Sequence, residues 1–174
     1  MKKVMQTPFT EEAVRSLHAG DQLILSGTVY TGRDAAHKRL CAMLAAGETL
    51  PVDLAGQAIY FVGPCPAPPG RPIGSAGPTT SGRMDAYSPV LIKECGLRAM
   101  IGKGGRSQAV IEAMKEYGCV YLAATGGAGA LIANSIVKAE VVAFDDLGPE
   151  AIYKLELDNL PLVVAIDADG NSLL

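Results

Sequence analysis

Short apolar runs alternate with segments of helical periodicity along most of the chain. Each run is four or five residues long and rich in aliphatic and aromatic side chains, which is typical of a buried strand. The predicted strands are Gln22–Ser26, Ala58–Val62, Leu97–Ile101, Val120–Ala124 and Val141–Phe144. Because helical patterns separate several of these runs, the sequence predicts an α/β fold.

Three helices are predicted from apolar residues that recur at three- and four-residue steps, and from residues typical of helix ends. Ser88 and Ser107 are predicted N-caps, and Pro89 suits the first turn. The predicted helices cover Asp34–Ala46, Ser88–Gly96 and Ser107–Gly118. After Gly148 the apolar pattern changes again, and the tail is expected to add strands to the α/β body.

The segment Pro64–Pro89 interrupts this alternation. It holds seven of the eleven prolines of the chain and four glycines, so neither a helix nor a central strand can persist there. A loop of this length in a compact domain is usually functional or disordered. Its second half favours function, because hydroxyl groups, a guanidinium and a carboxylate lie close together in sequence. These groups belong to Thr79, Thr80, Ser81, Arg83 and Asp85.

Length and composition predict a single globular domain over residues 1–174, with 49% hydrophobic and 19% charged residues. The net charge is −3 and the basic residues are scattered, so nucleic-acid binding is not expected. No apolar run reaches the roughly 18 residues that span a bilayer. We therefore expect a cytoplasmic protein without membrane association.

The four cysteines are expected to hold no metal. Cys41, Cys65, Cys95 and Cys119 form no CxxC pair that could begin a zinc or iron–sulfur site. Three of them lie in apolar periodic segments and are interpreted as small core residues. Cys65 alone lies in a polar loop.

Three cationic residues have a distinctive sequence context. Arg33 follows the first predicted strand at the start of a helix, Arg83 closes the proline-rich loop, and Lys103 follows a strand within Gly102–Gly105. Strand-to-helix junctions of α/β sheets often bind ligands, and helix N-termini favour anions. Arginine matches a carboxylate through two hydrogen bonds and lysine adds a point charge, so the three suit a small dicarboxylate. Each could instead be an ordinary solvated charge.

Other candidate residues keep alternative interpretations. His37 lies four residues after Arg33 and could share its helix face. Asp85 could orient Arg83 or cap the turn before the next helix. The glycine-rich stretch Thr125–Ala130 fits neither GxGxxG nor a P-loop, so close strand–helix packing or a backbone anion site explains it better than nucleotide binding.

Three motifs carry a resemblance that covers nearly the whole chain. They are SGTVYTGRDAAHKR at Ser26–Arg39, GSAGPTTSGRMDAYSP at Gly74–Pro89 and IGKGG at Ile101–Gly105. In this order they resemble the C-terminal portion of class I iron–sulfur fumarases. In two-subunit members of that family, this portion is the β subunit of fumarate hydratase or L-tartrate dehydratase.

The resemblance implies a swivelling β/β/α domain with mixed sheets flanked by helices. It implies an α subunit that carries a 4Fe–4S cluster and the acid/base groups, and association of the two subunits into a heterotetramer. Matched motif by motif, the substrate-binding residues of the family fall on Arg33, Thr79, Arg83 and Lys103. His37, Asp85 and Thr80 would lie behind them.

The activity implied is hydro-lyase chemistry on a C4 dicarboxylate. Fumarate to malate is the first expectation and tartrate to oxaloacetate the second, with turnover only when the α subunit is present. Arg33, Arg83 and Lys103 would stabilise the charge that develops on a substrate carboxylate. Thr79 would bond to the substrate and pass the C3 proton together with a partner carboxylate. The alternative from another class is a stand-alone module that binds a small anion or nucleotide without catalysis.

Overall fold

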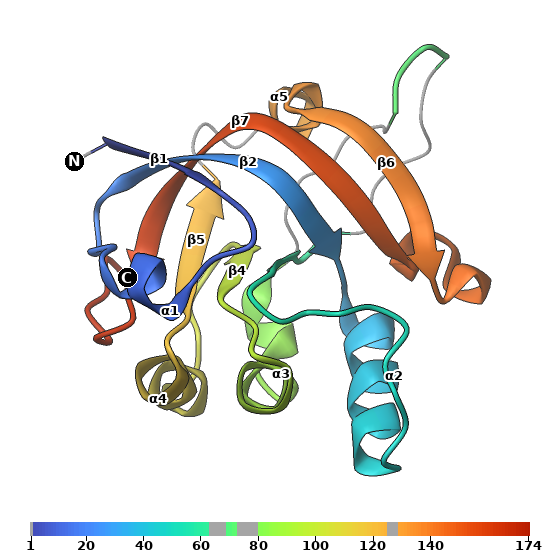
Figure 1. Cartoon of the computed structure of the whole chain (residues 1–174), viewed down its shortest axis with the longest axis horizontal. Helices are drawn as coiled ribbons and strands as arrows, with labels where there is room; N and C mark the ends of the chain where they lie inside the picture. Colours follow the sequence, from blue (N-terminus) through green and yellow to red (C-terminus); the bar gives the residue numbers. More distant parts are fainter. Residues whose placement is uncertain (1, 63–68, 73–79, 125–128) are drawn as a thin grey trace.

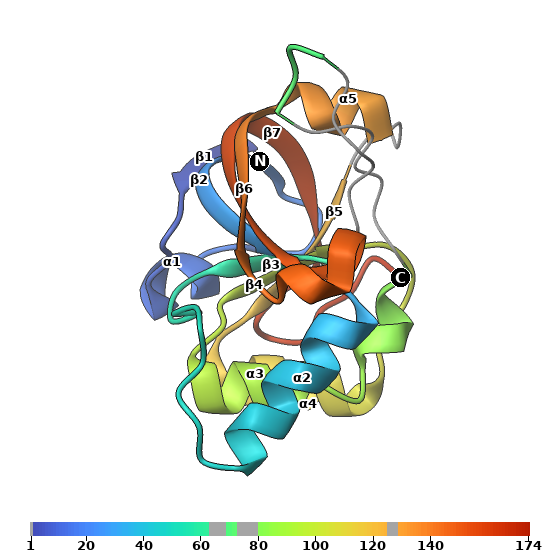
Figure 2. The same ribbon diagram turned by 90° about the vertical axis from the view of Figure 1, so that its right-hand side faces the viewer.

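The structure is a computed structural model that describes residues 2–62, 69–72, 80–124 and 129–174. A seven-stranded mixed sheet curves over three longer helices (Figures 1 and 2). The strands are β1 (Lys2–Gln6), β2 (Gln22–Thr31), β3 (Ala58–Tyr60), β4 (Ala99–Gly102), β5 (Val120–Ala124), β6 (Ile136–Ala143) and β7 (Ile152–Ile166). The helices are α1 (Glu11–Arg15), α2 (Asp34–Ala45), α3 (Ser88–Cys95), α4 (Gln108–Tyr117) and α5 (Gly129–Asn134), with 3-10 turns η1 (Ser81–Met84) and η2 (Asp145–Glu150).

Parallel and antiparallel pairing are segregated within the sheet. The strand order is β1-β2-β3-β4-β5-β7-β6, and the first five strands in this order pair in parallel. β7 is antiparallel to each of its neighbours, β5, β6 and β2. The additional β2–β7 pairing closes β2, β3, β4, β5 and β7 into a small barrel.

The two faces of this sheet carry separate apolar cores. One core fills the barrel interior with residues such as Leu25, Leu122 and Leu155. The other lies between the parallel strands and helices α2, α3 and α4, and contains Phe61 and Met100. Because both faces are covered, β3 and β4 are buried along their whole lengths, which explains their unbroken apolar sequences.

The helix ends follow the sequence signals with one difference. Ser107 caps α4, where its hydroxyl accepts a hydrogen bond from the Val110 N–H at 3.4 Å. Gly96 and Gly118 end α3 and α4 in the left-handed conformation, as predicted. The N-cap of α3 is Tyr87 and not Ser88. Ser88 is instead the first helical residue, and its buried hydroxyl donates back to the Met84 carbonyl.

Each predicted strand and helix is present with shifts at its ends. The tail was expected to add strands, and in the described structure it adds one. The predicted Val141–Phe144 strand is the second half of β6, and the tail forms the single fifteen-residue strand β7. The short elements β1, α1 and α5 have no counterpart in the sequence prediction. No helix in the described part of the chain combines the length and the hydropathy needed to cross a membrane.

Candidate functional site

The carboxyl ends of β2 and β4 lie at the same edge of the sheet. β2 pairs with β3 in parallel, and β3 with β4, so all three strands end on the same side. Arg33 lies two residues after β2, and Lys103 directly follows β4. This edge is the usual ligand-binding position in α/β sheets.

The η1 turn connects these two positions. Thr80 forms a parallel bridge with Lys103, and the Ser81 N–H donates to the Lys103 carbonyl at 2.9 Å. At the other side of η1, Arg83 forms an ion pair with Asp34, the first residue of α2. A continuous line of contacts therefore runs from the end of β4 to the start of α2.

The structure brings together the segments that carry the three predicted cations. Arg33 is partly buried and Lys103 is exposed, whereas the Arg83 side chain is 52% exposed. Thr80 is also exposed at this edge. Thr79, the fourth predicted substrate-binding residue, lies outside the described residues.

The first turn of α2 holds three buried polar atoms without a hydrogen-bond partner. They are Nε of Arg33, Oδ1 of Asp34 and Nε2 of His37. Only one other such atom, Oε1 of Gln57, occurs in the described part of the chain. An unpaired buried polar group costs about 1–3 kcal/mol. All three lie within the five residues from Arg33 to His37, so this turn holds most of the unpaired buried side-chain atoms in the described part of the chain.

His37 is the buried residue of this turn. Its Nδ1 is 2.8 Å from the Arg33 carbonyl, which can only accept, so Nδ1 carries the proton and Nε2 is an acceptor. The ring is fully buried and packs edge-on against Phe61 with centroids 5.3 Å apart. Burial lowers the pKa of His37 from 6.5 to about 4, partly offset by its bond to Arg33. His37 is therefore neutral at pH 7 and holds the Arg33 backbone in place.

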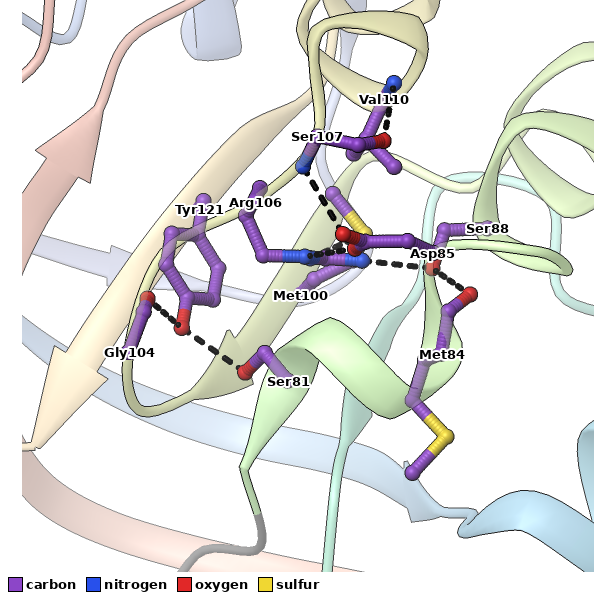
Figure 3. Close-up of polar contacts among 10 residues, drawn as sticks. All are labelled: Ser81, Met84, Asp85, Ser88, Met100, Gly104, Arg106, Ser107, Val110 and Tyr121. Atoms are coloured by element: carbon purple, nitrogen blue, oxygen red, sulfur yellow. Dashed lines mark hydrogen bonds and ion pairs between the residues drawn. The ribbon is translucent and has the colours of Figure 1, made fainter.

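Asp85 forms contacts that the sequence did not predict (Figure 3). Its carboxylate accepts from Nε of Arg106 at 2.8 Å and from the Ser107 N–H at 2.8 Å. It therefore caps the N-terminus of α4, and within the described chain it makes no ion pair with Arg83. Of the two interpretations of Asp85, orientation of Arg83 is not observed, because Arg83 pairs with Asp34. Asp85 does act as a cap, but for α4 and not for the next helix, α3.

Arg106 is the residue that sequence reasoning missed. Its side chain is fully buried, donates to Ser88 Oγ at 2.7 Å, and lies over the rings of Phe61 and Tyr121 at 5.1 and 5.0 Å. The available signal was an arginine directly before a helix cap, within a stretch otherwise rich in glycine. Arg106 fixes the turn after η1 against β4 and α4, and so positions the segment that carries Arg83.

A second buried contact fixes the start of η1. The Tyr121 hydroxyl lies 2.7 Å from Ser81 Oγ and 2.8 Å from the Gly104 carbonyl (Figure 3). Gly102 makes this approach possible, because a Cβ there would overlap the Ser81 hydroxyl and lie 2.8 Å from Cδ2 of Phe61. The glycine that ends β4 is thus required by close packing.

The described residues do not fit an iron–sulfur cluster. No group of three or more His, Cys, Asp or Glu side chains in the described ranges could hold a metal ion. Burial raises the pKa of the Cys95 thiol to about 11 and that of Cys119 to about 12, so both thiols are protonated at neutral pH in the chain by itself. Cys41 and Cys95 are half-buried rather than fully buried core residues, and Cys65 lies outside the described residues.

Comparison with protein families gives one match over residues 1–174, to the family described as Fumarase C-terminus. This chain belongs to that family. The three motifs that carry Arg33, Arg83 and Lys103 therefore lie within a fumarase C-terminal domain.

Relatives of the chain fall into two groups by length. A Methanocaldococcus jannaschii protein named "Putative L(+)-tartrate dehydratase subunit beta" is 43% identical over 169 residues, with 94% of this chain and 87% of the relative aligned. The anaerobic class I fumarate hydratase of Escherichia coli is 42% identical over 151 residues, which is 86% of this chain and 28% of the relative. Fumarate hydratase 1 of Leishmania major is 41% identical with the same coverage. The chain thus spans less than a third of these two hydratases, and both relative types are named for hydro-lyases.

Proposed function

We propose that this chain is the β subunit of a two-subunit iron–sulfur hydro-lyase that reversibly hydrates a C4 dicarboxylate. Fumarate to malate is the favoured reaction, and tartrate to oxaloacetate is the next. The observation that carries the proposal is the set of contacts that join the segments of Arg33, Arg83 and Lys103 at one sheet edge, beside unpaired buried polar atoms. The α subunit would bring the cluster, and the two chains would assemble as a heterotetramer.

Charge supports a dianionic ligand at this edge. Arg83 forms an ion pair with Asp34, whereas neither Arg33 nor Lys103 forms an ion pair within the described residues, so two cations at this edge lack a partner carboxylate. Asp85 and Arg106 neutralise each other below the surface. A substrate with two carboxylates would balance the excess, and the arginines could each bind a carboxylate through two hydrogen bonds.

The Arg83–Asp34 ion pair gives a starting arrangement for substrate binding. Arg83 is half exposed, so a carboxylate can reach its guanidinium without displacing the backbone of η1. Asp34 keeps the guanidinium directed toward α2 before substrate arrives. Arg33, with its Nε unpaired, would donate to the substrate from the other side.

Hydration next to a carboxylate builds negative charge on that group in the transition state. Cationic groups already fixed beside it lower the barrier, because little reorganisation is needed during reaction. We assign this role to Arg33, Arg83 and Lys103. Thr79 would hydrogen-bond the substrate and pass the C3 proton together with a carboxylate of the partner.

Substitution of Arg83 by Met tests this role in the complex of the two subunits. Loss of one charged partner should lower kcat/KM by about 30- to 1000-fold, which corresponds to roughly 2–4 kcal/mol of transition-state stabilisation. Steady-state hydration of fumarate and dehydration of tartrate would be measured for the wild type and the variant.

Arg39→Met is the matched control. Arg39 lies on α2, the helix that begins with Asp34, and its side chain is partly exposed, but it pairs with Asp146 through two hydrogen bonds and not with a residue of η1. This variant should retain kcat/KM within about threefold. Near-wild-type activity of Arg83→Met, or an equal loss in both variants, would refute the proposed role.

A further inference from the structure

Strand β6 leaves one edge of the sheet open. Within the described residues its only strand neighbour is β7, so β6 forms the outer edge of the sheet (Figure 1). Val137 and Val141 are 59% and 45% exposed there, although both are large and apolar. An open edge with exposed apolar residues can pair with a strand of another chain.

The residue types of β6 are arranged symmetrically about Ala139, with a charged residue and then a valine on each side. Lys138 and Glu140 flank Ala139, and Val137 and Val141 lie one position farther out. If two copies pair antiparallel about a two-fold axis at Ala139, Lys138 of each copy lies opposite Glu140 of the other. The same register places Val137 opposite Val141. Directly opposite residues of unlike charge stabilise an antiparallel pair, as do apolar ones.

Pairing within the chain extends this charge pattern. Lys138 lies opposite Glu156 of β7, and Glu140 lies opposite Lys154. A row of side chains across the paired sheets would therefore begin with Glu156 and Lys138 of one copy. It would continue with Glu140 and Lys154 of the second copy. The sign alternates at every step, and the two-fold axis generates a second identical row.

The bulges of β6 limit how far such pairing can extend. The register with β7 shifts between Ile136 and Lys138 and again between Val141 and Ala143, which leaves a regular stretch over 138–141. Bulges and charges also protect edges from unwanted pairing. A merely protected edge has no need of opposite charges placed symmetrically about one residue, so this pattern favours a specific, closed pair.

We propose that the β6 edge binds the β6 edge of a second copy of this chain, antiparallel, with the two-fold axis at Ala139. This inference does not depend on the proposed hydro-lyase activity. The regular stretch is short, so the pair should be in equilibrium with the monomer at micromolar concentrations. Such a dimer would hold two copies of the proposed site, at the carboxyl ends of β2 and β4, in one assembly.

Two single substitutions and their mixture test this register. Lys138→Glu gives a chain with two acidic residues around Ala139, and Glu140→Lys gives one with two basic residues. Each alone would put like charges opposite each other, and we expect dimerisation to weaken by roughly tenfold or more. Mixed in equal amounts, the two variants restore both opposite pairs and should form a one-to-one heterodimer. Sedimentation velocity from about 10 to about 500 µM would measure this.

Each substitution also places a like charge opposite Glu156 or Lys154 within its own chain, which could weaken dimerisation indirectly. This repulsion is the same whether a variant is measured alone or in the mixture, so recovery in the mixture reports only the contacts between chains. Lys93→Glu is the control, since Lys93 is exposed on α3, away from the sheet edge. Hydrogen exchange of wild-type residues 138–141 at low and high concentration gives a second readout, with protection expected only at high concentration. A monomeric wild type, unchanged dimerisation of the variants, failure of the mixture or concentration-independent exchange would overturn the proposal.

Discussion

His37 is kept neutral by the interior that surrounds it. The imidazole gains a hydrogen bond to the Arg33 carbonyl but loses water entirely, and the loss of water has the larger effect on its pKa. The charged form is therefore disfavoured in the folded chain relative to the unfolded one. The carbonyl that His37 holds belongs to the N-cap of α2, so this one buried ring couples protonation to the position of Arg33.

Stability should consequently fall at acidic pH. The folded pKa is about 4 and the ordinary value is 6.5, so between these values the unfolded chain binds a proton that the folded chain does not. The free energy of unfolding should rise with pH through this window and level off above it, by up to about 3 kcal/mol. Urea unfolding of the wild type and His37→Gln at pH 4.5, 5.5 and 7 would measure the slope.

His18 supplies the comparison, because it is exposed in the turn that follows α1. His18→Gln should keep the wild-type slope, whereas His37→Gln should flatten it. A wild-type slope in His37→Gln would show that other groups cause the acid sensitivity.

At the level of elements, the close contact between β4 and η1 restricts which residue can stand at position 102, and a substitution there tests this. A methyl group at Gly102 has no room beside Ser81 and Phe61. Gly102→Ala should therefore displace η1 and lower the free energy of unfolding by about 1–3 kcal/mol. It should also lower kcat/KM of the complex, because Arg83 lies on η1.

Gly105→Ala is the matched substitution, since a Cβ at Gly105 meets no atom within 4 Å. Its urea midpoint should stay close to that of the wild type. Equal midpoints for the two variants would mean that η1 can shift at no cost, and that Gly102 does not fix its position.

The three longer helices α2, α3 and α4 and the parallel strands β2 to β5 could be predicted because their signals are local. Ser107 and Gly118 are cap residues whose preferences follow from backbone geometry, and the apolar runs of β4 and β5 need only a buried environment. β1 and α1 were not predicted, because each has only five residues and depends on packing against distant parts of the chain. The Asp85–Arg106 pair spans 21 positions and has no local signature.

For the whole molecule, sequence context singled out three cations whose segments meet at one edge of the sheet. It could not supply the contacts that connect them, because the Arg83–Asp34 pair and the Thr80–Lys103 bridge join segments far apart in the chain. It also could not identify the three unpaired atoms of the first turn of α2, since burial is set by the complete fold.

The proposed function predicts that the chain needs a partner for turnover. Purified alone, it should show no hydration of fumarate, and when isolated from its source it should bring with it an iron-containing protein. Iron assay and activity of the copurified complex and of the isolated chain would test this. Tight binding of a small anion by the isolated chain, with no iron-bearing partner, would favour the stand-alone binding module instead.

The position of β7 has a consequence during translation. β7 pairs with residues Gln22 to Tyr30 of β2 but follows β2 by more than a hundred residues. This pairing therefore cannot form until β7 has been synthesised. At about 5–20 residues per second, the ribosome would leave the β2 edge uncovered for several seconds or longer. The nascent chain is thus most open to misassociation in this interval, which ends when β7 has emerged from the exit tunnel.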